Sequence, residues 1–416
     1  MKNIFFICLC ALFAFTGCAD DDDDLLTGGN VDIDLLPDSK PNDVVNTNVF
    51  DIINLNYPGL EKVKEFYETG EYYYAANALL EYYRTRTNVT NPNLSLINVT
   101  ISEADQTKAD YALEDYRFHV NNFYEDQETL KPYSLKKDGT INWTFSPEGA
   151  SDEYQKQLHR HQWFIPQAKA YRISGNEKYI QSWIEVYNNW IDQNPKPESG
   201  TNTTSWWQLQ VATRINDQVQ LLEYFKNSIN FTPEWLTTFL VEFAEQADFL
   251  VDYPYESGGN ILISQANALA TAGTLMPEFK NAEKWMETGY QILSEEVQNQ
   301  IMSDGWHKEM SLHYHISIVA DFYEAMKLAE ANQLSSKLPS NFTEPLRKAA
   351  EVVMHFTYPN YFSKGSDNVV PMFNDSWSRT RNVLKNTNFK QYVEMFPNSE
   401  ELKYMQTAGN GGTPQG

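Results

Sequence analysis

The sequence contains few cysteines: there are three, at positions 8, 10 and 18, and none in the rest of its 416 residues. A mature chain that begins at Cys18 could form no internal disulfide. This excludes a disulfide-rich scaffold and a zinc site built from thiolates.

Basic residues and long apolar runs are also scarce. Lysine and arginine number 32 against 56 acidic residues, which gives a formal net charge of −24 and a mean field that repels nucleic acid. Beyond the N-terminus, no segment approaches the roughly 20 consecutive apolar residues of a membrane-spanning helix. Apolar residues still make up 42% of the chain, enough for a sizeable core in one large domain or two ordinary ones. We therefore expect a folded protein without a nucleic-acid partner.

The N-terminus predicts export and lipid anchoring. Lys2 precedes a short apolar run, and the small residue Gly17 directly precedes Cys18, as in a bacterial lipobox. We predict a signal peptide over 1–17, an acylated Cys18, and an acidic flexible tether over 18–48 that includes a run of aspartates. The expected location is the outer membrane, at the cell surface, or the periplasm, with membrane contact only through the lipid.

Residues 49–400 have apolar residues at three- and four-residue spacing, which predicts helices. The expected helices cover roughly 60–68, 71–86, 102–119, 151–174, 177–193, 204–228, 233–252, 261–275, 278–300, 308–333 and 344–357. Long connections are expected at 87–101 and 120–150, and 401–416 is interpreted as the start of an interdomain linker. Such helices suggest hairpins stacked as a solenoid or closed into a ring, and the absence of a fixed-period repeat weakens the solenoid.

Aromatic residues, at 14% of the chain, are abundant. Packing between helices explains most of them, but flat rings also stack on sugar faces. An anchored, aromatic-rich protein therefore suggests a glycan partner.

Asn260 follows Gly258 and Gly259 where a helix is expected to begin. It could simply cap that helix, or its amide could donate to a substrate carboxylate at the positive helix end.

Tyr314 lies between two histidines at the start of another expected helix. His313 and His315 point to different sides of that helix, which predicts no metal site there. Tyr314 lies off the apolar stripe, so it could pack, or it could exchange protons if its neighbours lowered its pKa from about 10.

Trp207 and Arg214 share a helical face, which would place a stacking ring beside a guanidinium suited to carboxylate or sulfate. Core packing explains this spacing equally well. The segment 159–163, which includes His161, has a similar content.

Taken together, several segments resemble the heparinase III family, polysaccharide lyase family 12, in order and spacing. They are Tyr72-Tyr73-Tyr74, 159–163, Trp206-Trp207, Gly258-Gly259-Asn260 and 304–315. The resemblance implies an all-α fold, an incomplete (α/α) toroid of helical hairpins, with a cleft for a uronic-acid polysaccharide. It implies heparan sulfate of low sulfation as the substrate, and Asn260 and Tyr314 match the family's catalytic asparagine and tyrosine.

The chemistry of β-elimination suits those two side chains. Asn260 would neutralise the uronate carboxylate, and Tyr314 as phenolate would take the C5 proton and return a proton to the leaving oxygen. The reaction needs no metal or other cofactor. The other residues expected around the substrate are Arg214, Trp207, His161, Asp375, His307 and Glu309. His307 and Glu309 are expected to orient their neighbours, and basic residues are expected to gather in the cleft.

Members of the family continue into a β-sandwich domain that contributes a further catalytic histidine, and no residue of this sequence matches it. We therefore expect that domain to be absent, the cleft to be open, turnover to be much reduced, and the protein to be a monomer.

Two other functions remain open. A non-catalytic surface glycan-binding lipoprotein would share the anchor and the aromatic residues but would not need Tyr314. An (α/α) barrel glycoside hydrolase would need two carboxylates roughly 5 to 10 Å apart. Asp304, Glu309 and Asp375 are candidates, although no pair among them is decisive.

Overall fold

The computed structural model describes residues 40–121, 125–200, 204–363, 365 and 367–414. The predicted signal peptide, Cys18 and most of the predicted tether lie outside these residues. Among the described helices, none is both long enough and apolar enough to cross a membrane.

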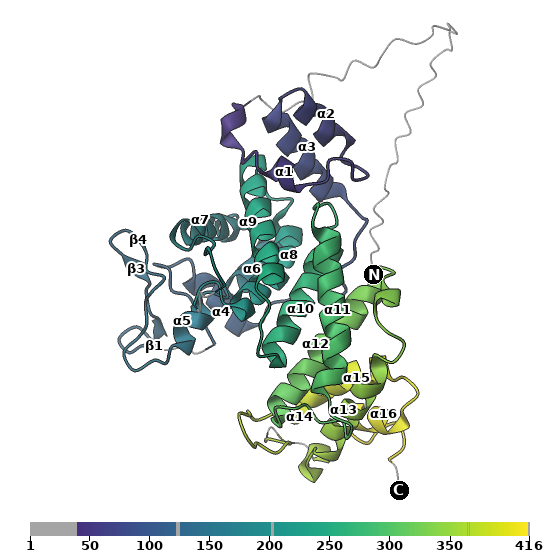
Figure 1. Cartoon of the computed structure of the whole chain (residues 1–416). Coiled ribbons are helices and arrows are strands. Elements are labelled where there is room, and N and C mark those ends of the chain that lie inside the picture. Colours follow the sequence, from purple (N-terminus) through teal and green to yellow (C-terminus); the bar gives the residue numbers. More distant parts are fainter. Residues whose placement is uncertain (1–39, 122–124, 201–203, 364, 366, 415–416) are drawn as a thin grey trace, which may run out of the picture. The chain divides into compact units, whose positions relative to one another are not determined.

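Helices dominate the described chain, as predicted (Figure 1). Their bounds are α1 Val49–Ile52, α2 Glu61–Glu68, α3 Tyr72–Thr85, α4 Glu103–Tyr111, α5 Glu153–Leu158, α6 Phe164–Ser174, α7 Lys178–Gln193, α8 Gln208–Phe225, α9 Pro233–Asp252, α10 Gly259–Leu275, α11 Ala282–Gln300, α12 Leu312–Ala331, α13 Thr343–His355, α14 Arg381–Val383, α15 Phe389–Met395 and α16 Glu400–Gln406. Two small antiparallel hairpins pair β1 Glu125–Asp126 with β2 Lys131–Pro132 and β3 Lys136–Lys137 with β4 Thr140–Ile141. Both hairpins lie in the connection predicted over 120–150.

Successive helices pack as hairpins. Contacts join α2 to α3, α6 to α7, α8 to α9, α10 to α11 and α12 to α13. Neighbouring hairpins also contact each other through their first helices. Thus α6 packs on α8, α8 on α10 and α10 on α12. This is the arrangement expected of hairpins that follow one another around a toroid.

The helix starts follow the chemistry of their sequences. Thr232 accepts a hydrogen bond from the backbone nitrogen of Trp235, 3.3 Å away, and Pro233 occupies the first position of α9, as predicted. The packed residues form two hydrophobic clusters, and α10 contributes to both, with Leu269 in one and Ile263 in the other. Residues 40–416 nevertheless form one compact unit.

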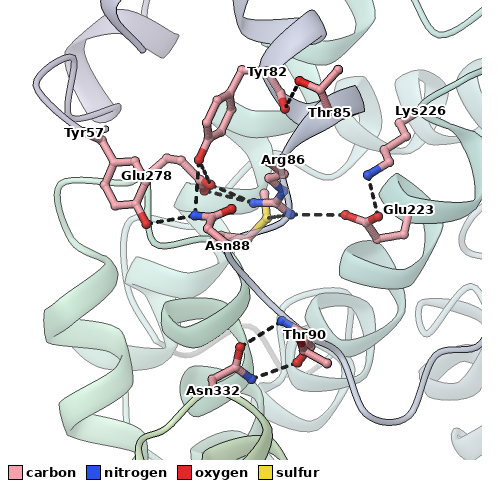
Figure 2. Close-up of polar contacts among 11 residues, drawn as sticks. Tyr57, Tyr82, Thr85, Arg86, Asn88, Thr90, Glu223, Lys226, Glu278 and Asn332 are labelled. Atoms are coloured by element: carbon pink, nitrogen blue, oxygen red, sulfur yellow. Dashed lines mark hydrogen bonds and ion pairs between the residues drawn. The ribbon is translucent and has the colours of Figure 1, made fainter. Parts of the chain in front are cut away.

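A buried ion pair holds the N-terminal hairpin, formed by α2 and α3, against later parts of the chain (Figure 2). Arg86, just after α3, places Nη1 2.9 Å from Glu278 and Nη2 3.3 Å from Glu223. The hydroxyl of Tyr82 donates to Glu278 as well, over 2.7 Å. The arginine and Glu278 side chains are 3% and 0% exposed, so this network holds α3 to α8 and to the turn before α11.

One predicted helix is broken in the structure. The segment predicted over 151–174 forms α5 and α6, separated by a turn in which His161 has a φ of 58°. Pro166 lies in the first turn of α6, where its missing N–H is tolerated, whereas the interior of a single long helix would not accept it.

The packed part of the chain extends past both predicted boundaries. Val45 is buried, and Lys40 lies 2.7 Å from Glu234, so the tether does not reach residue 48. At the other end Leu402 and Met405 of α16 are buried, so the residues directly after 400 are not a linker.

Candidate active site

Asn260 is the second residue of α10, and Gly258 occupies the cap position. Glu309 Oε1 accepts a hydrogen bond from the backbone nitrogen of Asn260 over 3.3 Å. Gly259 has a φ of 71°, which favours glycine, and a Cβ there would lie 2.7 Å from the same oxygen and would displace the Glu309 carboxylate. The half-buried side chain of Asn260 makes no hydrogen bond to a described residue. Its amide is therefore not a helix cap and can serve a ligand.

Tyr314 lies in the first turn of α12, which Ser311 caps. Its hydroxyl donates to Asp375 Oδ2 over 3.0 Å. Burial, this hydrogen bond, and the charges of Asp375, Glu309 and Glu153 raise the pKa of Tyr314 to about 12. The phenol therefore keeps its proton at neutral pH in the unliganded protein.

Asp375 is held in place by a segment that lies against the start of α12. Ser311 Oγ donates to the carbonyl of Asp375 over 2.6 Å and lies 3.0 Å from Ser376 Oγ. Asn374, at a φ of 57°, donates from Nδ2 to the carbonyl of Met310 over 2.7 Å. These contacts bring a carboxylate distant in sequence to the hydroxyl of Tyr314.

Glu309 connects the surroundings of Asn260 with those of Tyr314. It accepts the backbone hydrogen bond of Asn260, and its charge contributes to the raised pKa of Tyr314. Asn260 and Tyr314 therefore lie near the same carboxylate, at the starts of α10 and α12, two helices that pack together.

His307 is linked to the start of α10 through Gln300. It is fully buried, its Nε2 lies 2.9 Å from Gln300 Oε1, and Gln300 donates to the carbonyl of Gly259 over 3.1 Å. Burial lowers the pKa of His307 to about 4, so the ring is neutral. Its position fits an orienting role and allows no contact with a polysaccharide.

Arg214 is buried, and the prediction that it contacts substrate is wrong. Its guanidinium is 1% exposed, donates from Nε to Gln246 over 2.7 Å, and donates from Nη1 to the carbonyls of His159 and Ser205 over 2.8 Å. It also lies 4.3 Å from the ring centroid of Trp190. These contacts hold Nε and Nη1 inside the core, whereas Nη2 has no hydrogen-bond partner among the described residues.

The predicted pairing of Trp207 with Arg214 is also wrong. Trp207 is the residue before α8, and the ammonium group of Lys156 lies 5.0 Å from its ring centroid. His161 was also predicted to contact the substrate, and this prediction is wrong. Its side chain is 3% exposed and lies among the rings of Trp143 and Trp190. Burial holds the pKa of His161 well below its usual range.

Two charged neighbours of Tyr314 were not predicted. Arg160 Nη2 pairs with Glu153 over 3.2 Å, its Nε donates to Gln210 over 3.2 Å, and its charge interacts with Tyr314. The only sequence signal for Arg160 was its place beside His161. The carboxylates that act on Tyr314 show that acidic residues lie here too, in a region where basic residues were expected to gather.

The carboxylates do not assemble a metal centre in the described ranges. Within these ranges, no group of three or more His, Cys, Asp or Glu side chains is placed to hold a metal ion.

The sequence is similar to a known protein family and to individual proteins of known name. A family model described as the heparinase II/III N-terminus matches residues 49–404, which is most of the sequence. The chain belongs to the heparinase II/III family. It is 90% identical over its whole length to a heparin-sulfate lyase of Bacteroides thetaiotaomicron, of which it covers 59%. A heparin-sulfate lyase of Pedobacter heparinus is 32% identical over 87% of this chain and 53% of the relative.

Solved structures of the heparinase II/III family have the same fold. A crystal structure of heparinase III matches with a TM-score of 0.87 at 90% identity, over 89% of this chain and 56% of that one. A heparan sulfate lyase from Pedobacter heparinus matches with a TM-score of 0.69 at 30% identity, over 89% of this chain and 56% of that one. The predicted all-α toroid of helical hairpins is thus confirmed. The chain spans a little over half the length of these relatives, and its described residues include no β-sandwich.

Proposed function

We propose that this chain is the toroid part of a polysaccharide lyase that cleaves heparan sulfate by β-elimination. One observation carries the proposal: Glu309 binds the backbone of Asn260, and its charge also acts on Tyr314, so both residues lie near one carboxylate. Membership of the heparinase II/III family and the names of the relatives support it.

Asn260 would act on the uronic-acid carboxylate. At the second position of α10 its amide lies at the positive end of a helix, where an anion is stabilised. A hydrogen bond to the carboxylate lowers the cost of the negative charge that develops when the neighbouring C5 loses its proton. Asn260 therefore stabilises the intermediate without itself exchanging a proton.

Tyr314 would move the protons. As phenolate it takes the C5 proton, the electron pair left on C5 forms the C4–C5 double bond, and the bond from C4 to the leaving oxygen breaks. The new phenol then gives its proton to that oxygen, which is possible because a glucuronate presents both groups on one ring face. Since the pKa of Tyr314 is about 12 without substrate, we expect slow turnover by this chain alone.

The test is the ultraviolet absorbance of unsaturated uronate during incubation with heparan sulfate. We expect slow formation of unsaturated product, and a loss of about 100-fold or more in Tyr314→Phe, the scale of general acid–base catalysis. Tyr323→Phe is the matched control, because it removes a phenol on the same helix that donates to Glu394.

The alternatives give different results in this assay. Saturated products would indicate a glycoside hydrolase. Binding without any product, unchanged in Tyr314→Phe, would indicate a glycan-capture protein. Either result would overturn the proposed lyase.

We also propose, from the sequence, that low-sulfation heparan sulfate is the preferred substrate, that the protein is a monomer, and that acylated Cys18 anchors it to the outer membrane. If so, Cys18→Ala moves the protein from the membrane fraction to the soluble fraction. An unchanged distribution would contradict the anchor.

A further inference from the structure

Trp377 is the exposed tryptophan of the described chain. Its side chain is 61% exposed, whereas the other described tryptophans are buried or partly buried. Burying a large apolar side chain stabilises a fold, and this position forgoes that stabilisation. Tryptophan is enriched at interfaces, where its apolar ring and its N–H can both meet a partner.

The backbone around Trp377 is fixed on both sides. Before it, Asn374 and Asp375 are hydrogen-bonded to Met310 and Ser311 at the start of α12. After it, the backbone nitrogen of Arg379 donates to Asn368 Oδ1 over 2.8 Å. The exposed ring therefore projects from a segment that is tied to the rest of the protein.

His313 supports the indole from one side. The two rings meet edge to face, with centroids 4.3 Å apart and an angle of 84° between their planes. Arg379 Nη2 lies 3.2 Å from His313 Nδ1 and can donate to it. Burial and the charge of Arg379 lower the pKa of His313, so the ring stays neutral. This contact orients Trp377 and still leaves most of its surface exposed.

Trp377 lies next to the group that is proposed to react. Its supporting residue His313 precedes Tyr314, and those two rings have centroids 5.5 Å apart. Asp375, two residues before Trp377, accepts the hydrogen bond of the Tyr314 hydroxyl. A polysaccharide with one sugar at Tyr314 would thus bring a neighbouring sugar to the indole.

We propose that Trp377 is a stacking platform for a sugar ring adjacent to the one at Tyr314. The inference rests on the proposed function and deepens it. The C–H groups of a pyranose ring pack on the indole surface, and the indole N–H can bond to a hydroxyl or sulfate oxygen. Trp377 thereby contributes affinity and fixes which sugar lies over Tyr314, and it takes no part in proton transfer.

The test is calorimetric binding of a low-sulfation heparan sulfate tetrasaccharide to the full chain. We expect Trp377→Ala and Trp377→Leu to weaken binding about tenfold or more, the scale of an aromatic anchor, and Trp377→Phe to weaken it much less. Met372→Ala is the control, because Met372 is 58% exposed in the same connection and has no ring. We also expect the indole N–H resonance that is missing in Trp377→Phe to shift when the tetrasaccharide is added to the wild type.

The outcomes separate the two proposals. If the wild type binds and Trp377→Ala binds equally well, the platform is overturned and the proposed function stands. If Trp377→Leu binds as well as Trp377→Phe, general apolar contact replaces stacking and the platform is also overturned. If the wild type does not bind the tetrasaccharide, both proposals fail.

Discussion

Tyr314 keeps its proton because burial, the hydrogen bond to Asp375 and nearby carboxylate charges all oppose the phenolate. Asp375→Asn removes one acceptor and one negative charge but leaves the burial. We therefore predict that the pKa of Tyr314 falls from about 12 toward its usual value without reaching it. Ultraviolet titration of the phenol, taken as the difference between Asp375→Asn and the same variant with Tyr314→Phe, measures the shift.

The same substitution tests the role of the phenolate. If Tyr314 is the base, the rate of unsaturated-product formation rises with pH toward its pKa, and Asp375→Asn moves this rise to lower pH. Asp304→Asn is the control, because Asp304 is exposed and accepts a hydrogen bond from the backbone of Trp306 in its own turn. A titration curve unchanged in Asp375→Asn would refute the account of the raised pKa.

Arg214 stabilises the fold, and we predict that Arg214→Ala lowers the free energy of unfolding by about 3–5 kcal/mol. The change leaves the carbonyls of His159 and Ser205 without their buried donor. Urea denaturation measures the loss, with the exposed Arg172→Ala as the control. A variant as stable as the wild type that has lost affinity for heparan sulfate would instead restore Arg214 to the binding site.

Helical spacing could not have shown that Arg214 is buried. Spacing gives the direction of a side chain around its own helix, not the depth at which it ends. Because α8 packs against α6, α9 and α10, the direction of Arg214 leads into the core. The catalytic roles predicted for Asn260 and Tyr314 came from the resemblance, whereas Asp375 reaches Tyr314 through tertiary packing that no local pattern records.

At the scale of elements, the sequence predicted helices best where apolar spacing and a cap agreed. For α9 the Thr232 cap, Pro233 and the apolar stripe all indicated one helix, and the structure has it. For 151–174 the spacing continued through a break that Pro166 could have indicated. The start of α12 was predicted too early because the Ser311 cap was overlooked.

The docking of segment 374–379 on α12 depends on Ser311, which both caps the helix and binds Asp375. We predict that Ser311→Ala lowers stability by about 1 kcal/mol, the usual effect of a lost cap. We also predict faster amide hydrogen exchange in 374–379, measured by mass spectrometry.

Ser102→Ala is the matched control, because Ser102 caps α4 through the backbone nitrogen of Asp105, 3.1 Å away, and lies far in sequence from segment 374–379. It should cost similar stability and leave exchange in 374–379 unchanged. Equal exchange in Ser311→Ala and the wild type would show that the segment is held by other contacts.

At the scale of the whole molecule, the net charge of −24 makes distant parts of the folded chain repel one another. Specific contacts must therefore hold these parts together. The ion pair of Arg86 with Glu278 joins the N-terminal hairpin to the later helices (Figure 2). We predict that Glu278→Ala lowers the free energy of unfolding by about 3 kcal/mol, since a buried arginine loses its principal partner. Urea denaturation followed by circular dichroism measures the loss.

The size of this loss depends on burial rather than on the pairing of charges as such. Glu344→Ala is the control, because its pair with Arg347 is solvent-exposed and should be worth about 1 kcal/mol or less. Replacing both buried partners, as Arg86→Met with Glu278→Leu, should recover much of the stability, because no unpaired charge remains buried. If Glu278→Ala and Glu344→Ala cost the same, the buried network does not hold the hairpin, and apolar packing between α3 and α9 must do so instead.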